Sequence, residues 1–459
     1  MIILKEYLNK ILYGSEVLEM KSVIIQPFYL NGKVKIPPSK SLSHRAVIAA
    51  GLSDGECTVD NISMSEDIIA TCEIMEKLSV KIKQFPNSLR IIGTGRPRIA
   101  CDGILNNGIA RDKTAGNELQ CNESGSTLRF LIPIAMLTGE QVIFKGKSKL
   151  VQRTLKPYYE IFDKQNIKYT TNNGNLPLII NGSLKPGIFE LRGDVSSQFI
   201  TGLIYALPLL NGDSTIKITT EMESIGYIDL TIDVLSKFGV KIENNNYREF
   251  KIKGNQHFVK RDFRVEGDFS QAAFYLAAGV LGGEVECLDL NMQSLQGDRV
   301  IVDIIKEMGG EITVKDGVLK ASKSDLKGTI IDASQCPDLV PIVAVLAALS
   351  EGTTEIINAS RVRIKESDRL KAMATELNKI GAEVIEREDS LLIHGKPMLR
   401  GGVVSSWNDH RIAMAMAMAS IRCTDELTIE DSTAVKKSYP HFYEDFKSLG
   451  GKVNERTMG

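Results

Sequence analysis

The chain has 459 residues, of which 43% are hydrophobic and 25% charged, and its formal net charge is −1. This length exceeds one ordinary core, so we expect two or more domains. A nearly neutral chain has no overall field with which to hold nucleic acid, so any anion site must come from local clusters. Seven cysteines without a CxxC pair and five histidines away from metal-ligand spacing argue against a disulfide framework and a structural zinc. They predict reduced thiols in the cytoplasm.

The N-terminal residues 1–20 do not have the pattern of a targeting segment. Lys5, Glu6 and Lys10 interrupt the apolar positions, and no small-residue cleavage site follows. The segment could form a short amphipathic helix, or it could result from the choice of start codon, because a strand-like stretch opens at Met20. We expect a dispensable extension. No apolar run in the chain reaches the roughly 18 residues that a membrane span needs, so we expect no membrane segment.

Six segments along the chain repeat one pattern, a short polar turn followed by an apolar helix of small residues. Their anchor positions lie 83, 71, 73, 67 and 73 residues apart, at residues 43, 126, 197, 270, 337 and 410. Each helix runs into a turn and a strand, and a second helix and a hairpin usually follow, as in "VDIIKEMGGEITVKDGVLKA". Ordinary α/β alternation is the simpler alternative, but six helices of one character argue against it. We predict an α/β chain of six units in two groups of three, with a boundary near residues 260–268 and a strand in 21–38 that completes the second group.

The polar turns at the helix starts carry nearly all the unusual charge clusters. A helix start presents unpaired N–H groups and the positive end of the dipole, so converging helix starts would form an anion site. The candidate segments are "PPSKSLSHR" (37–45), "ESGSTLR" (123–129), "VSSQF" (195–199), "CPDLV" (336–340), "RIKESDRL" (363–370), "NDHR" (408–411) and "VKKSYPHF" (435–442). Each alone could be a helix cap or a loop, but their recurrence at one point of the repeats favours a shared site.

Together these segments resemble the enolpyruvyl transferase family, and within it the branch that acts on shikimate 3-phosphate. The matching motifs occur in family order from residue 38 to residue 442: "KSLSHR", "ESGSTLR", "SSQF", "PDLVP", "RIKESDR", "NDHRIAM" and "KSYPHF". The resemblance implies an α/β fold of two domains, each built from three βαβαββ repeats as an inside-out barrel, with the active site in the cleft between them. It also implies two chain crossovers. The expected domains are residues 39–265 and residues 21–38 with 266–459.

The resemblance implies an enzyme that moves the enolpyruvyl group of phosphoenolpyruvate (PEP) to the 5-hydroxyl of shikimate 3-phosphate and releases phosphate, in aromatic amino acid biosynthesis. Both substrates are highly charged anions, which Arg can hold bidentately and Lys as a point charge. By motif match, PEP is expected to meet Lys40, Gly125 (backbone), Arg153, Gln198, Arg369, Arg411 and Lys437. The same match places shikimate 3-phosphate against Lys40, Ser41, Arg45, Ser196, Ser197, Gln198, Ser224, Tyr227, Asp338 and Lys365.

The implied chemistry needs two proton transfers. The hydroxyl must lose a proton and the PEP methylene must gain one, giving a tetrahedral intermediate; elimination then reverses the methyl protonation and expels phosphate. Carboxylates tuned by nearby cations suit this exchange. The resemblance assigns Asp338 as the base toward the hydroxyl, Glu366 as the acid and base at the methylene carbon, and Lys40 to proton transfer or charge stabilisation. One helical turn could aim Lys365, Glu366 and Arg369 the same way. No metal or other cofactor is expected, because basic residues neutralise the developing charge, and we expect a monomer.

Four positions depart from the family pattern. Glu123 stands where Asn is frequent, and Ser126 where Thr is frequent; either change alters hydrogen bonding in the loop. Thr154 replaces a common Pro and loosens the loop that holds Arg153. Arg361 replaces an Asn near the acceptor phosphate and could add a cation there.

Three alternatives fit the sequence less well. UDP-N-acetylglucosamine enolpyruvyl transferase uses a Cys in the loop before the residue matching Arg153, and "GKSKLVQR" has none. A non-catalytic binder of anionic metabolites would gain nothing from Asp338 and Glu366. Nucleic-acid binding conflicts with the neutral charge and with the lack of aromatic residues among the basic clusters.

Overall fold

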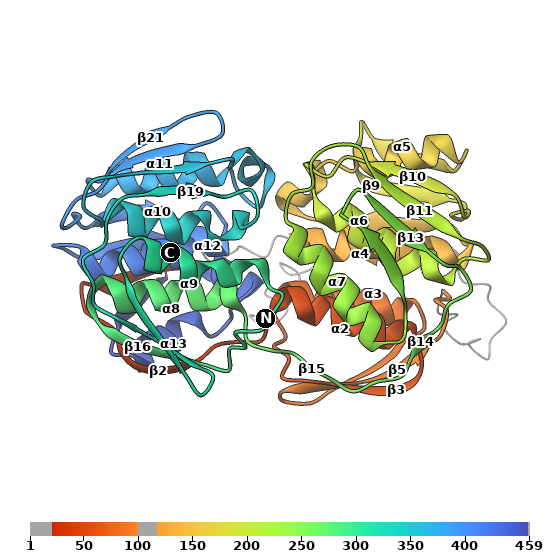
Figure 1. Cartoon of the computed structure of the whole chain (residues 1–459), viewed down its shortest axis with the longest axis horizontal. Helices are drawn as coiled ribbons and strands as arrows, with labels where there is room; N and C mark the ends of the chain where they lie inside the picture. Colours follow the sequence, from red (N-terminus) through yellow and green to blue (C-terminus); the bar gives the residue numbers. More distant parts are fainter. Residues whose placement is uncertain (1–20, 100–116, 458–459) are drawn as a thin grey trace, which may run out of the picture.

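The computed structural model describes residues 21–99 and 117–457. The expected N-terminal extension, residues 1–20, lies outside the described residues. Two lobes stand side by side in Figure 1. Each lobe has its own hydrophobic core: one draws on residues 42–265, and the other on residues 23–36 and 269–453. We call these lobes the first half and the second half, and we propose that the two domains are residues 39–265 and residues 21–38 with 266–459.

The first half alternates helices with short strands. Its helices are α2 (Lys40–Leu52), α3 (Glu66–Lys77), α4 (Gly125–Ala135), α5 (Lys156–Lys164), α6 (Ser197–Ala206) and α7 (Ile225–Lys237). Its strands are β3 (Ser53–Asp60), β4 (Lys81–Gln84), β5 (Ser88–Thr94), β6 (Glu118–Gln120), β7 (Val142–Lys145), β8 (Lys168–Asn172), β9 (Asn175–Asn181), β10 (Ile188–Leu191), β11 (Ser214–Ile218), β12 (Ile242–Asn245), β13 (Glu249–Ile252), β14 (Phe258–Val259) and β15 (Phe263–Arg264).

The second half repeats this alternation. Its helices are α8 (Phe269–Gly282), α9 (Ile301–Glu307), α10 (Val340–Ala348), α11 (Arg369–Lys379), α12 (His410–Ala419) and α13 (Phe442–Ser448). Its strands are β1 (Lys21–Gln26), β2 (Asn31–Lys35), β16 (Glu284–Leu288), β17 (Glu311–Lys315), β18 (Val318–Ser322), β19 (Ile330–Asp332), β20 (Thr353–Ile357), β21 (Glu383–Glu386), β22 (Leu391–His394), β23 (Gly402–Ser405), β24 (Leu427–Glu430) and β25 (Lys452–Thr457). Its short 3-10 helices include η5 (Gly297–Val300), η6 (Pro337–Leu339), η7 (Ser360–Ile364) and η9 (Ser432–Lys437).

Six sheets in the described chain share one strand order, which confirms the predicted sixfold repeat. In β19-β20-β22-β21, for example, the strand after the first helix pairs in parallel with the strand before it and antiparallel with the returning hairpin strand. The sheet β23-β24-β1-β25 has the same order, but the N-terminal strand β1 takes the place of the hairpin strand. The fold is therefore α/β, with three units in each half.

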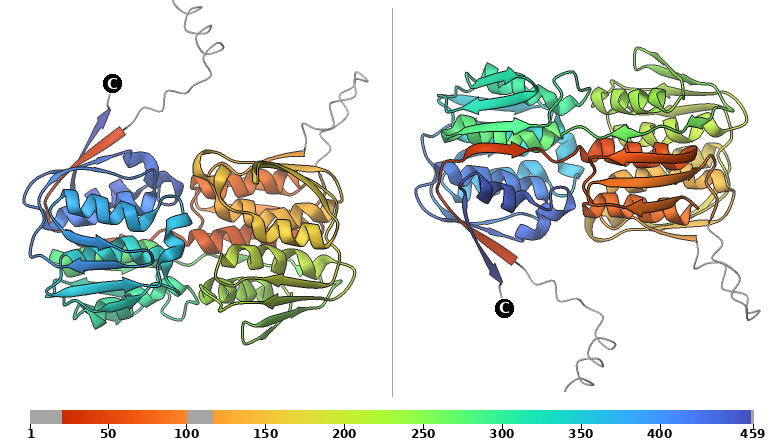
Figure 2. Two further views of the ribbon diagram at one scale, coloured as in Figure 1. Left: turned by 90° about the horizontal axis from the view of Figure 1, so that it is seen from above. Right: turned by 90° about the horizontal axis from the view of Figure 1, so that it is seen from below.

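The first helix of each unit lies inside its half, and the sheets lie outside (Figure 2). Every residue of α8, α10 and α12 is buried. Helices that are apolar on all sides are stable only in such surroundings, which explains their Ala, Leu, Ile and Met composition. The resulting barrel is inside-out, as the family resemblance implied.

Residues 21–38 differ from the sequence prediction in one respect. We predicted one strand, but the segment forms two: β1 completes the sixth sheet, and β2 pairs in parallel with β16 at the start of the fourth. Pro27, directly after β1, and the pair Asn31-Gly32 at the start of β2 mark the break between the two strands, and the prediction did not use them. The chain then crosses to the first half near Pro38 and returns beside it near Gly267, where the two crossings form an antiparallel bridge.

Candidate active site

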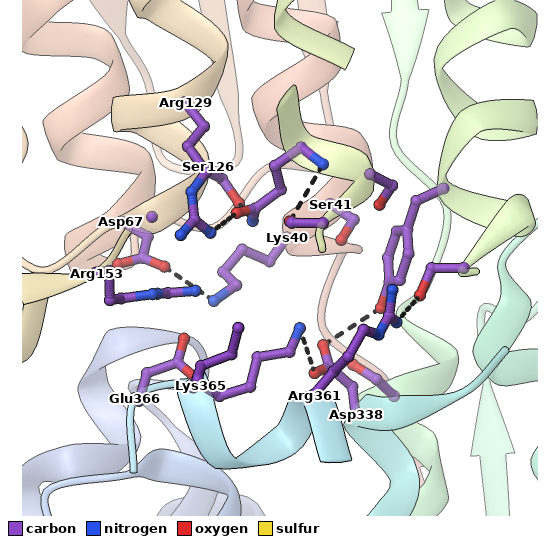
Figure 3. A pocket seen from close by; sticks show the side chains of 18 of the residues that line it. Lys40, Ser41, Asp67, Ser126, Arg129, Arg153, Asp338, Arg361, Lys365 and Glu366 are labelled. Carbon is purple, nitrogen blue, oxygen red and sulfur yellow. Dashed lines mark hydrogen bonds and ion pairs between the residues drawn. The ribbon is translucent and has the colours of Figure 1, made fainter. Parts of the chain in front are cut away.

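The helix starts of both halves meet at one cleft, as the repeat pattern predicted. Serine or aspartate side chains cap these helices: Ser39 for α2, Ser124 for α4, Ser196 for α6, Asp268 for α8 and Asp409 for α12. In Figure 3, Lys40, Ser126 and Arg153 approach from the first half, and Asp338 and Glu366 lie opposite them on the second. The cleft has an empty volume of about 950 Å³, its open mouth included, which is enough for two small ligands.

The structure brings nearly all the sequence-predicted site residues into this lining. They are Lys40, Ser41, Arg45, Gly125, Arg153, Ser196, Ser197, Gln198, Ser224, Tyr227, Asp338, Lys365, Glu366, Arg369 and Arg411. The exception is Lys437, which is not a lining residue. Its Nζ lies 2.6 Å from Oε2 of Glu123 and donates to the carbonyl oxygen of Asn408 at 2.7 Å.

The first half contributes a group of cations. Lys40 donates to Oδ2 of Asp67 at 2.8 Å. Burial lowers the pKa of Lys40, but the carboxylates of Asp67 and Glu366 outweigh burial and raise that pKa above its usual value, so the amine stays charged. Arg153 lies against the start of α4, where a Cβ on Gly125 would come within 2.6 Å of its Nη1. A glycine at this position therefore lets the guanidinium approach the backbone.

Gln198 is fixed by two neighbours. Its Oε1 accepts a hydrogen bond from Arg129 at 2.7 Å, and its Nε2 donates to Oγ of Ser126 at 2.9 Å. The carbonyl oxygen of Thr154 accepts a hydrogen bond from Arg129 at 3.3 Å. Thr154 is the residue that replaces a common Pro and was expected to loosen this loop. The side-chain amide of Gln198 is thus held across the starts of α4 and α6.

The second half contributes carboxylates gathered around Arg369. This arginine is 1% exposed, and its nitrogens contact Asp338 at 2.9 Å, Glu366 at 2.8 Å and Asp409 at 2.8 Å. The three carboxylates engage all three of its nitrogens, so Arg369 orients these groups in addition to any ligand contact. α11 begins at Arg369 because Asp368 caps it by accepting from the amide of Lys371.

One detail of the sequence prediction is therefore wrong. Lys365 and Glu366 do not share a helical turn with Arg369, because they precede the helix and Lys365 has extended backbone angles. All three side chains still line the cleft, because the loop before α11 lies at the cleft.

The two candidate catalytic carboxyls are strongly acidic in this setting. Burial raises the pKa of Asp338, but Arg411, Lys365 and Arg369 hold it well below its usual value. Burial acts on Glu366 in the same way, and Arg369 and Arg153 hold its pKa well below the usual range. Both groups are therefore carboxylates, and each is poised to accept a proton once a bound anion offsets the neighbouring cations.

At one end of the cleft, Arg361 joins the two halves. This residue of η7 contacts Glu223 at 2.5 Å and donates to Oγ of Ser224 at 2.5 Å. Close by, Arg45 donates to Oγ1 of Thr231 and to the carbonyl oxygens of Ser41 and Tyr227, at 2.7–2.9 Å. Arg45 thus shapes the pocket wall. Arg361 adds a cation to the cleft lining, which the sequence analysis had left open.

Burial changes the pKa of a further cleft lysine. Desolvation is the largest cause that lowers the pKa of Lys365 to about 8, and Asp338 partly offsets it. Its Nζ lies 3.5 Å from Oδ1 of Asp338. Because this lysine faces the predicted base, its charge contributes to keeping Asp338 ionised.

Sequence reasoning missed several residues of the site. Asp67, Arg129, Asp268, Ser270 and His410 line the cleft without having been assigned to it. Arg129 and His410 belong to quoted motifs and could have been found there. Asp67 lies in the first turn of α3, and none of the candidate motifs covers that segment.

The described residues show neither a metal cluster nor a membrane helix. No group of three or more His, Cys, Asp or Glu suited to a metal ion occurs in residues 21–99 and 117–457. Among the same residues, no helix is both long enough and apolar enough to cross a bilayer.

Comparisons with known proteins agree on one family. The model of the family described as EPSP synthase (3-phosphoshikimate 1-carboxyvinyltransferase) matches residues 24–446. Proteins named 3-phosphoshikimate 1-carboxyvinyltransferase from Clostridium novyi (strain NT) and Clostridium kluyveri are each 56% identical over 440 residues, covering 96% of this chain and 100% of theirs. A solved structure of EPSP synthase from Acinetobacter baumannii has a TM-score of 0.79 and 24% identity, covering 95% of this chain and 100% of that one. At that identity the structural likeness supports the fold.

Proposed function

The chain belongs to the EPSP synthase family, and we propose that the cleft between its halves is where its reaction takes place. The enzyme transfers the enolpyruvyl group of PEP to the 5-hydroxyl of shikimate 3-phosphate and releases phosphate, in the shikimate pathway. No finding favours the UDP-sugar reaction or a non-catalytic binder.

One observation carries the assignment of the cleft. Three buried guanidinium nitrogens that belong to its lining have no hydrogen-bond partner within the described residues: Nε of Arg129, Nε of Arg153 and Nη1 of Arg411. A buried charged donor without a partner is costly. An anionic ligand bound in the cleft would remove that cost, so the site favours phosphate and carboxylate groups.

The PEP subsite is proposed at the side where cations of both halves meet. Arg369, Arg153 and Lys40 are the cations that act on Glu366. Arg411, Gln198 and the backbone of Gly125 also line this side of the cleft. Arg369 forms ion pairs with both Asp338 and Glu366. Lys437 can bind PEP in this subsite only after its ion pair with Glu123 breaks.

The acceptor subsite is proposed beside Asp338. Ser196, Ser197 and Ser224 offer hydroxyls, and Arg361 offers a charged donor for the phosphate. Ser41, Arg45, Tyr227 and Lys365 form the remaining walls of the subsite.

The proton transfers follow from the electrostatics. Asp338 is ionised and removes the proton from the acceptor hydroxyl. When the charges of PEP offset Arg153 and Lys40, the pKa of Glu366 rises toward its usual value, so the group can exchange a proton with the methylene carbon. Lys40 stays charged beside Asp67 and stabilises the anionic intermediate.

We also propose that the enzyme acts as a cytoplasmic monomer. The cysteines in the described part of the chain are unpaired and buried, which suits a reducing compartment. Both walls of the cleft come from one chain, so no second subunit is needed to complete the site.

Phosphate release tests the function directly. The purified protein should release phosphate when PEP and shikimate 3-phosphate are both supplied, and should release none with either alone. Release with PEP and UDP-N-acetylglucosamine instead would replace the shikimate assignment by the UDP-sugar reaction. No release with any pair would contradict an enolpyruvyl transferase.

A further inference from the structure

A second buried carboxyl, Asp298, lies behind the proposed base. It belongs to η5, is 5% exposed and is not part of the cleft lining. The hydroxyl of Tyr227 lies 3.2 Å from Oδ2 of Asp298 and 3.2 Å from Oδ2 of Asp338. One phenol hydroxyl therefore lies between a carboxyl that faces the cleft and a carboxyl that does not.

The two carboxyls have opposite surroundings. Arg369 and Arg411 contact the oxygens of Asp338 at 2.9 and 3.0 Å. For Asp298, Tyr227 supplies the side-chain hydrogen bond, and its buried Oδ1 has no partner within the described residues. An ionised carboxylate with an unpaired buried oxygen is costly, whereas a protonated one costs much less. A proton is therefore more stable on Asp298 than on Asp338.

The charges around Asp298 support this order. The titratable groups that face it are Tyr227, Asp268, Cys336, Asp338 and Arg411. Burial, followed by the repulsion of Asp338, raises the pKa of Asp298 to about 7, although Arg411 lowers it. Burial and both aspartates raise the pKa of Tyr227 well above its usual value, so the phenol keeps its proton.

We propose that Asp298 receives, through Tyr227, the proton that Asp338 removes from the acceptor hydroxyl. This rests on the proposed function, since it takes Asp338 as the base. The O–H bond of the acceptor breaks as an O–H bond forms on Asp338. Asp338 passes that proton to the oxygen of Tyr227 while Tyr227 gives its own proton to Asp298.

The net result is the movement of one proton and no electron. Asp338 is ionised again, Tyr227 is neutral and Asp298 is a neutral acid. After the product leaves, the proton returns by the same route to Asp338, which releases it to solvent in the open cleft. The relay restores the negative charge of Asp338 beside Arg369, Arg411 and Lys365. If Asp338 stayed protonated, these three cations would lack that counter-charge. The relay also removes the proton from the reach of the attacking oxygen.

The substitution Asp298→Asn tests the relay, because Asn keeps the shape and can accept the hydrogen bond but cannot take the proton. We expect kcat to fall about tenfold or more, with KM for both substrates changed by less than about twofold. Asp303→Asn on α9 is the matched control, since it removes an exposed carboxylate from the adjoining helix and should leave kcat unchanged. An Asp298→Asn variant with wild-type kcat would overturn the proposal.

The pH profile separates proton transfer from mere support of Tyr227. Above about pH 7 Asp298 is ionised and can accept a proton, and below it the site is already occupied, so wild-type kcat should fall as pH drops through this range. In Asp298→Asn this fall of kcat at low pH, the acid limb of the profile, should be absent. A slower variant that keeps the limb would assign Asp298 to a structural role and contradict the relay.

Two further measurements close the test. Tyr227→Phe should lower kcat, and adding Asp298→Asn to it should cause little further loss, because both substitutions break one relay. A double variant whose loss in kcat equals the product of the two single losses would contradict the proposal.

Infrared difference spectra of the protein without substrates should show a carboxyl proton taken up as pH falls through about 7, and Asp298→Asn should abolish that band. A band that persists would overturn the assignment to Asp298. The infrared result does not depend on turnover, so it distinguishes failure of the relay from failure of the proposed function, which the phosphate assay reports.

Discussion

Lys437 and Glu123 show how a single residue alters the site. Oε2 of Glu123 contacts Lys437, and its Oε1 accepts from Oγ of Ser148 at 2.7 Å, so the carboxylate ties η9 of the second half to the loop before α4. Lys437 is 8% exposed at its side chain, so the pair is shielded more than a surface ion pair. A PEP molecule that uses Lys437 must compete with this carboxylate.

Glu123→Gln should therefore strengthen PEP binding. Removing the competing charge should lower KM for PEP by about two- to fivefold, equivalent to about 1 kcal/mol or less, and leave KM for shikimate 3-phosphate unchanged. Steady-state kinetics with each substrate varied in turn would measure it. Glu118→Gln is the control, because that carboxylate pairs with Lys145 at the same 2.6 Å but is 42% exposed. A higher KM for PEP would instead mean that Glu123 holds Lys437 in place for the ligand.

The sequence identified the charged side chains of the site but not their partners. Lys40, Asp338 and Glu366 belong to local motifs at helix starts, so their type and position were readable. Asp67 contacts Lys40, and Asp298 is linked to Asp338 through Tyr227, both from segments without such motifs. The side chain of Lys437 pairs with Glu123. These contacts join residues from 27 to 314 positions apart, which no local pattern records.

At the scale of elements, one carboxylate joins the starts of two helices. Oδ1 of Asp409 accepts from the amide of Arg411 and caps α12, while its Oδ2 accepts from Ser367 at 2.9 Å and Arg369 at 2.8 Å just before and at the start of α11. Asp409 is fully buried. The relative position of the two helices, and with it that of Glu366, depends on this residue.

Asp409→Asn should destabilise the protein far more than an exposed cap does. The variant leaves Arg369 without one buried counter-charge, which should cost about 3 kcal/mol or more in the free energy of unfolding. Asp368→Asn is the matched control: it caps α11 and pairs with Arg363, but both side chains are partly exposed, so about 1 kcal/mol is expected. Urea unfolding followed by circular dichroism would measure both. Equal losses in the two variants would contradict a special role for the buried cap.

Element positions were predictable where the signal was local. The apolar helices and the Gly-ended second helices carry their own periodicity and caps, so the six units could be counted from the sequence. The start of α11 was misplaced because a charged run gives no periodicity before its cap at Asp368. The place of β1 in the last sheet is non-local, and it was predicted from the count of repeats, which left a strand in residues 21–38 to complete the second group.

For the whole molecule, neither half contains a complete site. The first half supplies Lys40 and Arg153, and the second supplies Asp338, Glu366 and Arg411. The two crossings at Pro38 and Gly267 lie together, so the halves are joined at one edge of the cleft. The repeat predicted two groups of three units, while their placement face to face came from the family resemblance.

The most direct test of this joint site follows solvent deuterium into the product. Addition converts the PEP methylene to a methyl group, and elimination removes one of its three hydrogens, so wild-type protein in deuterated water should form product with deuterium in the enolpyruvyl methylene. Glu366→Gln should make that product at least about 100-fold more slowly, while both substrates still bind. Proton nuclear magnetic resonance of the product measures rate and deuterium content together. A Glu366→Gln variant that matches the wild type in both would contradict the assignment of proton transfer to this cleft.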